Sequence, residues 1–289
     1  MDEITKDKQI QDLTPNEVLQ IYLIEGPNGL RKRTPPRLAP KMFLESGILK
    51  YIPSNPRCVW CQAPFKGLGA PLMKAIGKDK SKFNPTLCTE CEDFVRQHNA
   101  GVEIEMSMLF ADIRGSTTLA EKMSAVEFSG IINRFYSVTS DILAMEKGFL
   151  EKLAGDQVSA FFIPGLAGAQ HYTHALNAAQ KILKATGHMD AEGPWVSVGV
   201  GIHIGKTFFG SVGNKDGLSD LAFLGDAPNT AARLASSAKA GEILISTPIA
   251  EMLQLDISAL ENRQLELKGK SDQVNVWVMN LNRPAQVAV

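Results

Sequence analysis

The sequence lacks the hydrophobic segments that membrane and secreted proteins carry. No apolar stretch approaches the roughly 18 to 20 residues that a membrane-spanning helix needs. The first residues, MDEITKDKQIQDLT, contain neither the basic segment nor the apolar segment of a secretory signal. We therefore expect no membrane span and a cytoplasmic location.

An excess of charge of one sign is also missing. The formal net charge is -1 at pH 7, so nothing gives the chain a general attraction to nucleic acid or to an anionic membrane. Nucleic acid is therefore not an expected partner, and any bound anion must be met by local groups. The hydrophobic content of 44% is that of a globular protein with a buried core.

Cysteine is scarce, but its spacing is informative. The four cysteines form two CxxC pairs, CVWC at Cys58 and Cys61 and CTEC at Cys88 and Cys91. In a reducing compartment this pattern favours a metal over disulfides. Four thiolates at this spacing suit tetrahedral Zn²⁺, which would also give so short a segment its fold. An iron–sulfur cluster and redox-active or unligated thiols are the alternatives.

The cysteine pairs and the predicted helices and strands divide the chain into three parts. Residues 1–55 contain one predicted helix over 14–25, and we interpret this part as an attachment segment. Residues 56–97 hold both cysteine pairs and are too short to build a core without a metal. From 102 to 280, strands and helices alternate, which predicts an α+β domain with a mostly antiparallel sheet flanked by helices.

Three details of that pattern are specific enough to test. The helical pattern over 117–146 is interrupted near Ser124. Two short strands, 148–153 and 157–163, are joined by a tight turn. The stretch WVSVGVGIHIGKTFFGSVG, residues 195–213, predicts two strands that turn near its central Gly-Lys pair.

Two aspartates lie at the edges of predicted strands. Asp112 ends the apolar run MLFAD, and Asp156 lies in the turn of EKLAGDQVSAFF. Two carboxylates converging on one point would repel each other unless a cation lay between them. Hard cations such as Mg²⁺ take oxygen ligands of this kind. The alternative is that Asp112 caps the following helix and Asp156 merely fills a turn.

A third segment, LGDAPNTAARLAS, adds two polar groups. Asn229 and Arg233 are four residues apart, and therefore lie on one face of the predicted helix. Such a pair can donate to a ribose or phosphate oxygen, and arginine does so with a planar fork. On helices, however, Asn/Arg pairs are usually solvated surface.

Five segments together resemble a known family. MLFADIRGST, EKLAGDQVSAFF, GVGIHIGKTFFGSVG, LGDAPNTAARL and LELKG are similar, in this order and at fitting spacing, to the signature segments of the class III nucleotidyl cyclase catalytic domain. The resemblance covers about residues 102 to 280 and implies a ferredoxin-like core. Five ordered motifs outweigh the separate alternatives for each residue.

The resemblance implies a two-metal reaction. Asp112 and Asp156, assisted by the backbone carbonyl of Ile113, would hold two Mg²⁺ or Mn²⁺ ions. The ribose 3′-oxygen would attack the α-phosphorus, and pyrophosphate would leave. Arg233 resembles the family's transition-state arginine and Asn229 the residue that orients the ribose.

Further residues would bind the triphosphate. The backbone N–H groups of the RGSTT turn can bind phosphate oxygens at a helix start. The alternative is a capped helix entry, and both can hold at once. Within this turn, the residues expected to bind the nucleotide are Gly115, Ser116 and Thr117. Lys268 matches a triphosphate-binding lysine, with Lys270 as a weaker rival.

The choice of base rests on two positions. Lys152 occupies the place where adenylyl cyclases carry lysine, and an ammonium can donate to adenine N1. The partner position, normally Asp or Thr, is Ala222, whose side chain cannot form a hydrogen bond with a base. Loss of one hydrogen bond costs about 0.5 to 1.5 kcal/mol, less than the roughly 1.5 to 3 kcal/mol of a charge-assisted bond. ATP is thus the favoured substrate, and Asp220 or Ser219 are candidates to replace the missing group.

In this family each site is built between two catalytic domains. Because the chain carries the complete residue set once, the resemblance implies a homodimer with two equivalent sites and an inactive monomer. The principal hypothesis is an adenylate cyclase that makes cyclic AMP from ATP. A guanylate or dual-specificity cyclase, and a silent cyclase-like module whose zinc segment carries the function, are the alternatives.

Overall fold

A computed structural model of the chain describes residues 12–26, 29, 32, 54, 56–81, 86–97, 101–213, 219–266 and 273–281. Its contacts divide the chain into two compact units. The first unit comprises Met1–Ile104, Ile163–Ala169 and Thr207–Leu224. The second comprises Glu105–Phe162, Gln170–Lys206 and Gly225–Val289.

The first unit contains short helices and one strand of its own. These are α1 (Pro15–Glu25), α4 (Ala70–Ala75), α5 (Thr89–Gln97), α8 (Pro164–Ala167) and β5 (Ser219–Leu224). Helix α1 confirms the helix predicted over 14–25, because Thr14 and Glu17 form a reciprocal capping box and proline occupies the first turn. Its apolar side chains are buried, and it packs against α8.

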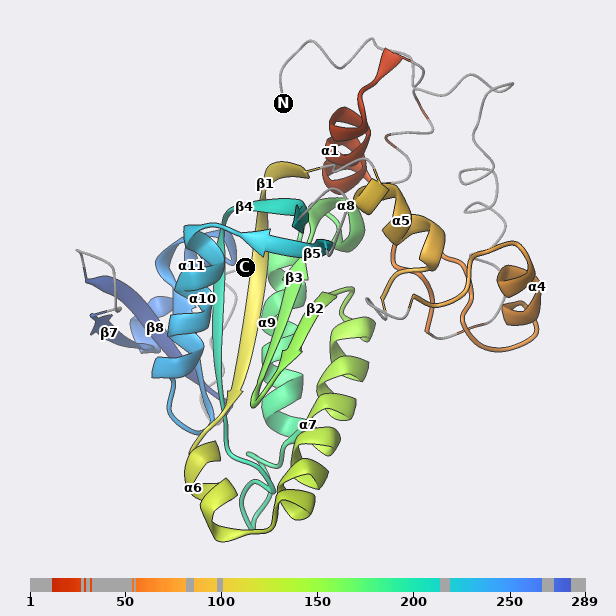
Figure 1. The fold of residues 1–289 in the computed structure, drawn as a ribbon. Coiled ribbons are helices and arrows are strands. Elements are labelled where there is room, and N and C mark those ends of the chain that lie inside the picture. Colours follow the sequence, from red (N-terminus) through yellow and green to blue (C-terminus); the bar gives the residue numbers. More distant parts are fainter. Residues whose placement is uncertain are drawn as a thin grey trace. The chain divides into compact units, whose positions relative to one another are not determined.

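The strands form one mixed sheet (Figure 1). Besides β5 they are β1 (Gly101–Ile113), β2 (Phe149–Ala154), β3 (Gln157–Phe162), β4 (Val198–Gly213), β6 (Glu242–Ser246), β7 (Glu261–Leu265) and β8 (Val274–Asn280). Their order is β2-β3-β1-β4-β6-β8-β7, and β5 pairs with β4. The β4 and β6 pair is parallel, while the pairs β1·β3, β2·β3, β4·β5, β6·β8 and β7·β8 are antiparallel.

The second unit also contains helices, several of which contact strands of this sheet (Figure 1). They are α6 (Ser116–Lys122), α7 (Ala125–Met145), α9 (His171–Ala185), α10 (Asp226–Ser237), α11 (Thr247–Met252) and the 3-10 turn Ile257–Ala259. Helices α7 and α9 contact each other and β3, and α10 contacts β6. The predicted interruption near Ser124 is confirmed, because Ser124 caps α7 through a capping box with Glu127. The α+β class with a mostly antiparallel sheet is thereby confirmed.

One strand prediction is wrong. Residues 198–213 form the single strand β4 instead of two strands with a turn at Gly205 and Lys206. Glycine is needed there for packing, since a Cβ on Gly205 would lie 2.8 Å from the Cβ of Ala227 at the start of α10. The strand continues past this point and pairs with β5, where Phe209 lies opposite Phe223.

Candidate functional site

The pairing of β1 with β3 brings the two predicted aspartates together. Asp112 lies opposite Gln157 in the register, and the Ile113 N–H donates to the Asp156 carbonyl oxygen at 3.0 Å. Burial raises the pKa of the Asp112 carboxyl and the Asp156 carboxylate raises it further, while Arg114 and Gln157 oppose the shift. The backbone contact and the direction of this effect both place the two aspartates at one end of the β1–β3 pair.

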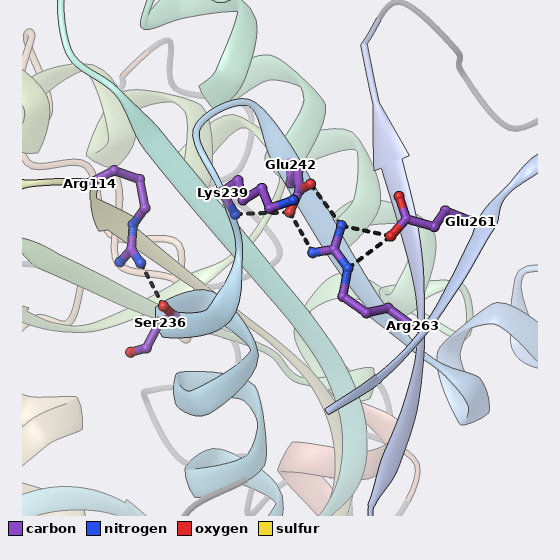
Figure 2. Close-up of polar contacts among 6 residues, drawn as sticks. All are labelled: Arg114, Ser236, Lys239, Glu242, Glu261 and Arg263. Carbon is purple, nitrogen blue, oxygen red and sulfur yellow. Dashed lines mark hydrogen bonds and ion pairs between the residues drawn. The ribbon is translucent and has the colours of Figure 1, made fainter. Parts of the chain in front are cut away.

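Arginine and glutamine side chains hold the Asp112 carboxylate. Arg114 forms an ion pair with it, and the Gln157 amide donates to Oδ2 at 3.3 Å. Figure 2 shows the second contact of Arg114, whose Nη1 donates to the Ser236 carbonyl oxygen at 2.6 Å in the last turn of α10. This arginine therefore connects the end of β1 to the end of α10.

The alternatives for the two aspartates can now be judged. Helix α6 begins after Gly115, which has φ +70 and no side-chain cap, so Asp112 does not cap it. Asp156 does lie in the turn between β2 and β3, after Gly155 with φ +64. Its carboxylate is not idle there, because the Ser116 hydroxyl donates to it. The helix-capping role of Asp112 is thus wrong, and the turn position of Asp156 is correct.

The donor set at this point suits a hard divalent cation. Two carboxylates and the Ile113 carbonyl are oxygen donors of the kind that Mg²⁺ and Mn²⁺ prefer. The repulsion that Asp156 exerts on Asp112 is the electrostatic condition that a bound cation relieves. The residues present therefore fit such an ion.

Helix α10 carries the predicted Asn229 and Arg233 on the side away from its buried face. Asn229 is exposed and Arg233 half-buried, whereas Ala227, Ala231 and Leu234 are buried. Within the described residues, the side chains of Asn229 and Arg233 make no hydrogen bond or ion pair. An arginine that is partly buried and unpaired is available to an anionic ligand.

The remaining predicted residues fall in several places. Lys152 is exposed on β2, and no hydrogen bond or ion pair among the described residues joins it to either aspartate. Ala222 is half-buried on β5, opposite Gly210. Thr117 follows Ser116 in the first turn of α6. Lys268 and Lys270 lie outside the described residues.

An ion-pair cluster fixes the strand that precedes Lys268 in the chain. Arg263 on β7 donates to both carboxylate oxygens of Glu242 at 2.9 Å, and it also pairs with Glu261 at 2.9 Å (Figure 2). Burial alone would raise the pKa of Glu242, but the bonds from Arg263 and from the Lys239 N–H hold it below its ordinary value. A fork-to-fork pair of this kind anchors β7 to the start of β6.

The four cysteines form a compact cluster. All are buried, and their sulfur atoms lie within 4.8 Å of one another. The Cys61 and Cys88 sulfurs are 3.6 Å apart, far longer than a disulfide bond of about 2.05 Å. The Cys88 N–H donates to the Cys58 sulfur at 3.3 Å. This donor set and spacing fit a thiophilic metal ion in a tetrahedral site.

Aromatic residues around the cluster were not predicted. The Tyr22 hydroxyl of α1 donates to the Trp60 carbonyl oxygen at 2.5 Å, and the two rings lie 5.2 Å apart. Burial raises the pKa of Tyr22 well above its ordinary value, and the nearby sulfurs raise it further. The signal that could have predicted this contact was the tryptophan inside CVWC, because a large apolar side chain between two metal ligands must be covered by another apolar group.

Of the helices that the structure describes, none has the length and apolarity to traverse a bilayer.

Comparison with known sequences gives a family match. The model of the adenylate and guanylate cyclase catalytic domain matches residues 100–280. An adenylate cyclase from Anabaena cylindrica is 29% identical over 186 residues, covering 60% of this chain and 36% of that protein. A receptor-type guanylate cyclase of Caenorhabditis elegans, gcy-6, is 25% identical over 213 residues, covering 72% of this chain and 18% of that protein. The chain thus spans about a third or less of the length of these relatives.

Solved structures agree with this match. The adenylyl cyclase CyaB from P. aeruginosa is 28% identical with a TM-score of 0.53, covering 62% of this chain and 94% of that one. The guanylyl cyclase Cya2 has a TM-score of 0.55 at 21% identity, covering 65% of this chain and 99% of that one, and supports the fold. Because the family match extends over more than half of the sequence, the chain belongs to the adenylate and guanylate cyclase catalytic domain family.

Proposed function

We propose that the protein is an adenylate cyclase that converts ATP to 3′,5′-cyclic AMP and pyrophosphate. The observation that carries this proposal is the juxtaposition of Asp112 and Asp156 where β1 and β3 pair. Family membership supplies the reaction class, and the aspartates supply a place for its metal ions.

Asp112, Asp156 and the Ile113 carbonyl would hold two Mg²⁺ or Mn²⁺ ions. When bound, these ions supply positive charge beside the ribose 3′-hydroxyl and the triphosphate. The protein contributes rigid placement, because both aspartates belong to a paired strand edge and its turn. Arg114 and Ser116 hold the carboxylates in position before the ligands arrive.

Other residues would position the nucleotide. Arg233 would stabilise charge that develops on the α-phosphoryl oxygens, and Asn229 would orient the ribose. The N–H groups of Gly115, Ser116 and Thr117 would receive phosphate oxygens. Lys268 would bind the triphosphate as a point charge.

Lys152 is the reason for proposing ATP. Its exposed ammonium would donate to adenine N1, which is an acceptor. Ala222 favours a second candidate function, a guanylate or dual-specificity cyclase, because alanine offers no group that selects adenine and guanine O6 can also accept from Lys152. Asp220 remains a candidate to replace the missing group, and its carboxylate also lies 3.3 Å from Arg96.

We also propose that two copies of the chain share each site. Among the described residues, neither Asp112 nor Asp156 forms a hydrogen bond or ion pair with Lys152, Asn229 or Arg233, which is compatible with a site that two copies complete. A symmetric homodimer would bring one set from each copy together, twice.

The cysteine cluster is proposed to hold a structural Zn²⁺ ion. Four buried sulfurs within 4.8 Å support a single tetrahedral site. We further propose the division of the chain into an N-terminal segment (1–55), a zinc module (56–97) and a catalytic domain (102–280).

Product identification tests the activity. Purified protein would be incubated with Mg²⁺ or Mn²⁺ and with ATP or GTP, and the product identified by mass spectrometry. We expect cyclic AMP as the main product, and none from an Asp112→Asn variant. Cyclic GMP as the main product would favour the second candidate, and the absence of any cyclic nucleotide would contradict both.

A further inference from the structure

The cysteine module is connected to β5 by two separate routes inside the first unit, one through the β4 residue Phe209 and one directly from α5. One is a row of buried aromatic rings that begins at Trp60, between the first two cysteines, and the other is a chain of ion pairs that begins at Glu92, next to the last cysteine. Both end within two residues of Ala222, the position that the proposed function assigns to the base.

The aromatic contact is buried. The Trp60 ring lies 6.2 Å from the Phe209 ring of β4, and the Phe209 ring lies 4.6 Å from the Phe223 ring of β5. All three residues are at most 5% exposed. Buried aromatic pairs of this geometry attract each other beyond the effect of the area that they bury. The position of Phe223 therefore depends on the position of Trp60.

The polar contact runs along α5. This helix begins at Thr89, so Cys91 lies in its first turn, and Glu92 follows it. Glu92 is buried and accepts from Arg96 at 2.6 Å, and Arg96 also reaches the Asp220 carboxylate at 3.3 Å. The exposed Asp220 pair contributes little energy. It does show that the Arg96 side of α5 faces β5, against which the helix packs.

Strand geometry relates these contacts to Ala222. Side chains alternate along β5, so Leu221 and Phe223 share the buried face while Asp220 and Ala222 share the other. A shift of Phe223 or Asp220 therefore moves Ala222 with it. Both contacts depend on the cysteines, because the CVWC turn presents Trp60 and Cys91 fixes the start of α5.

We propose that a Zn²⁺ ion on Cys58, Cys61, Cys88 and Cys91 fixes strand β5 through Trp60 and α5, so that nucleotide binding depends on occupancy of the zinc site. The nucleotide part rests on the proposed function, whereas the control of β5 by the metal does not. Trp60 and Arg96 are positioning residues, since they act through β5.

Hydrogen exchange on the full chain tests the control of β5. Zinc content would be measured by elemental analysis, and amide exchange of residues 219–224 compared before and after chelation. We expect one zinc per chain and, after its removal, exchange at least about tenfold faster in β5 while β6 is unchanged. Less than half an equivalent of zinc, or unchanged exchange in β5, would overturn the proposal.

A Trp60→Ala variant separates the contact from the folding of the module. It keeps all four sulfurs, so it should retain zinc and still show faster exchange in β5. Its KM for ATP should rise about 3- to 10-fold while kcat changes less than about twofold. Leu72→Ala, an exposed position on α4, is the matched control and should behave as the parent protein. Retained zinc with unchanged β5 exchange in Trp60→Ala would refute the coupling.

Failure of this proposal and failure of the proposed function are distinguishable. If the chain makes no cyclic nucleotide, zinc content and exchange still decide whether the metal controls β5. If it makes cyclic AMP but KM is the same in the parent and Trp60→Ala proteins, the nucleotide part of this proposal is wrong and the proposed activity stands.

Discussion

His171, at the start of α9, is held neutral by its surroundings. The Ser107 N–H donates to its Nδ1 at 3.2 Å, so the ring proton resides on Nε2. Burial lowers the pKa of His171 to about 4, and the nearby His174 contributes in the same direction. The folded protein therefore resists protonation of this ring, while the unfolded chain accepts a proton near pH 6.5.

This difference predicts a pH dependence of stability. Above about pH 6.5 the neutral His171 ring leaves the free energy of unfolding at its full value. As the pH falls from 6.5 toward 4, this free energy should decrease, because the unfolded state binds the proton first. The loss of unfolding free energy should reach about 3 kcal/mol. Urea denaturation at pH 7.5, 6, 5 and 4.5, compared with His171→Gln, would measure it. An equal slope in both proteins would contradict the assignment.

Lys152 gives a prediction about substrate choice. In Lys152→Glu the ammonium that donates to adenine is lost, and a carboxylate that accepts from guanine N1–H and N2–H replaces it. The ratio of kcat/KM for ATP over GTP should fall at least about tenfold, since a charge-assisted bond contributes roughly 1.5 to 3 kcal/mol. Competition assays would measure this ratio, with Lys184→Glu on the exposed side of α9 as control. An unchanged ratio would exclude Lys152 from base recognition.

At the scale of elements, the contact between β4 and α10 is unusually close. A Cβ on Gly201 would lie 2.4 Å from the Ala235 backbone nitrogen and 2.7 Å from the Ala231 carbonyl oxygen. Contacts below about 3 Å force the backbone to move, and α10 carries both Asn229 and Arg233. The glycine therefore determines how near these side chains are held to the sheet.

We expect Gly201→Ala to displace α10. Overpacking of this kind costs about 1 to 3 kcal/mol, and turnover should fall more than substrate affinity because Arg233 is displaced. Denaturation and steady-state kinetics would measure both effects. Gly130→Ala on α7 is the matched control, because nothing lies within 4 Å of the added Cβ. It should stabilise the protein by about 0.5 to 1 kcal/mol. Equal behaviour of the two variants would refute the packing argument.

Elements with local signals were predicted well from the sequence, and contacts between distant segments were not. Helices with explicit caps, such as the one after Thr14, were predicted because capping is a local signal. The strand-edge positions of Asp112 and Asp156 were predicted from the local pattern, whereas their common site was expected only from the family resemblance. The division of β4 at Gly205 was wrong, because glycine signals a turn locally but here makes room for Ala227, which is distant in sequence. The Arg114 contact with the Ser236 carbonyl was missed for the same reason, because the two residues are 122 positions apart.

At the scale of the whole molecule, a shared site predicts complementation. Asp112→Ala and Arg233→Ala should each be inactive alone, because each removes one contribution to both sites of the dimer. In a random mixture about half of the dimers contain both variants, and each such dimer has one intact site of two. Up to about a quarter of full activity should therefore return on mixing. Complete absence of rescue, with dimers present by light scattering, would argue against the shared site.

The contact of Trp60 with Phe209 has a consequence for how the chain folds during its synthesis on the ribosome. The two aromatic partners are about 150 residues apart, which corresponds to roughly 7 to 30 s of translation at about 5 to 20 residues per second. During that interval the cysteine-rich segment has already emerged, while the strand that covers Trp60 is still unmade. A nascent chain that captures its metal early would gain order in this segment before its aromatic partner exists, and zinc starvation should therefore lower the yield of folded protein.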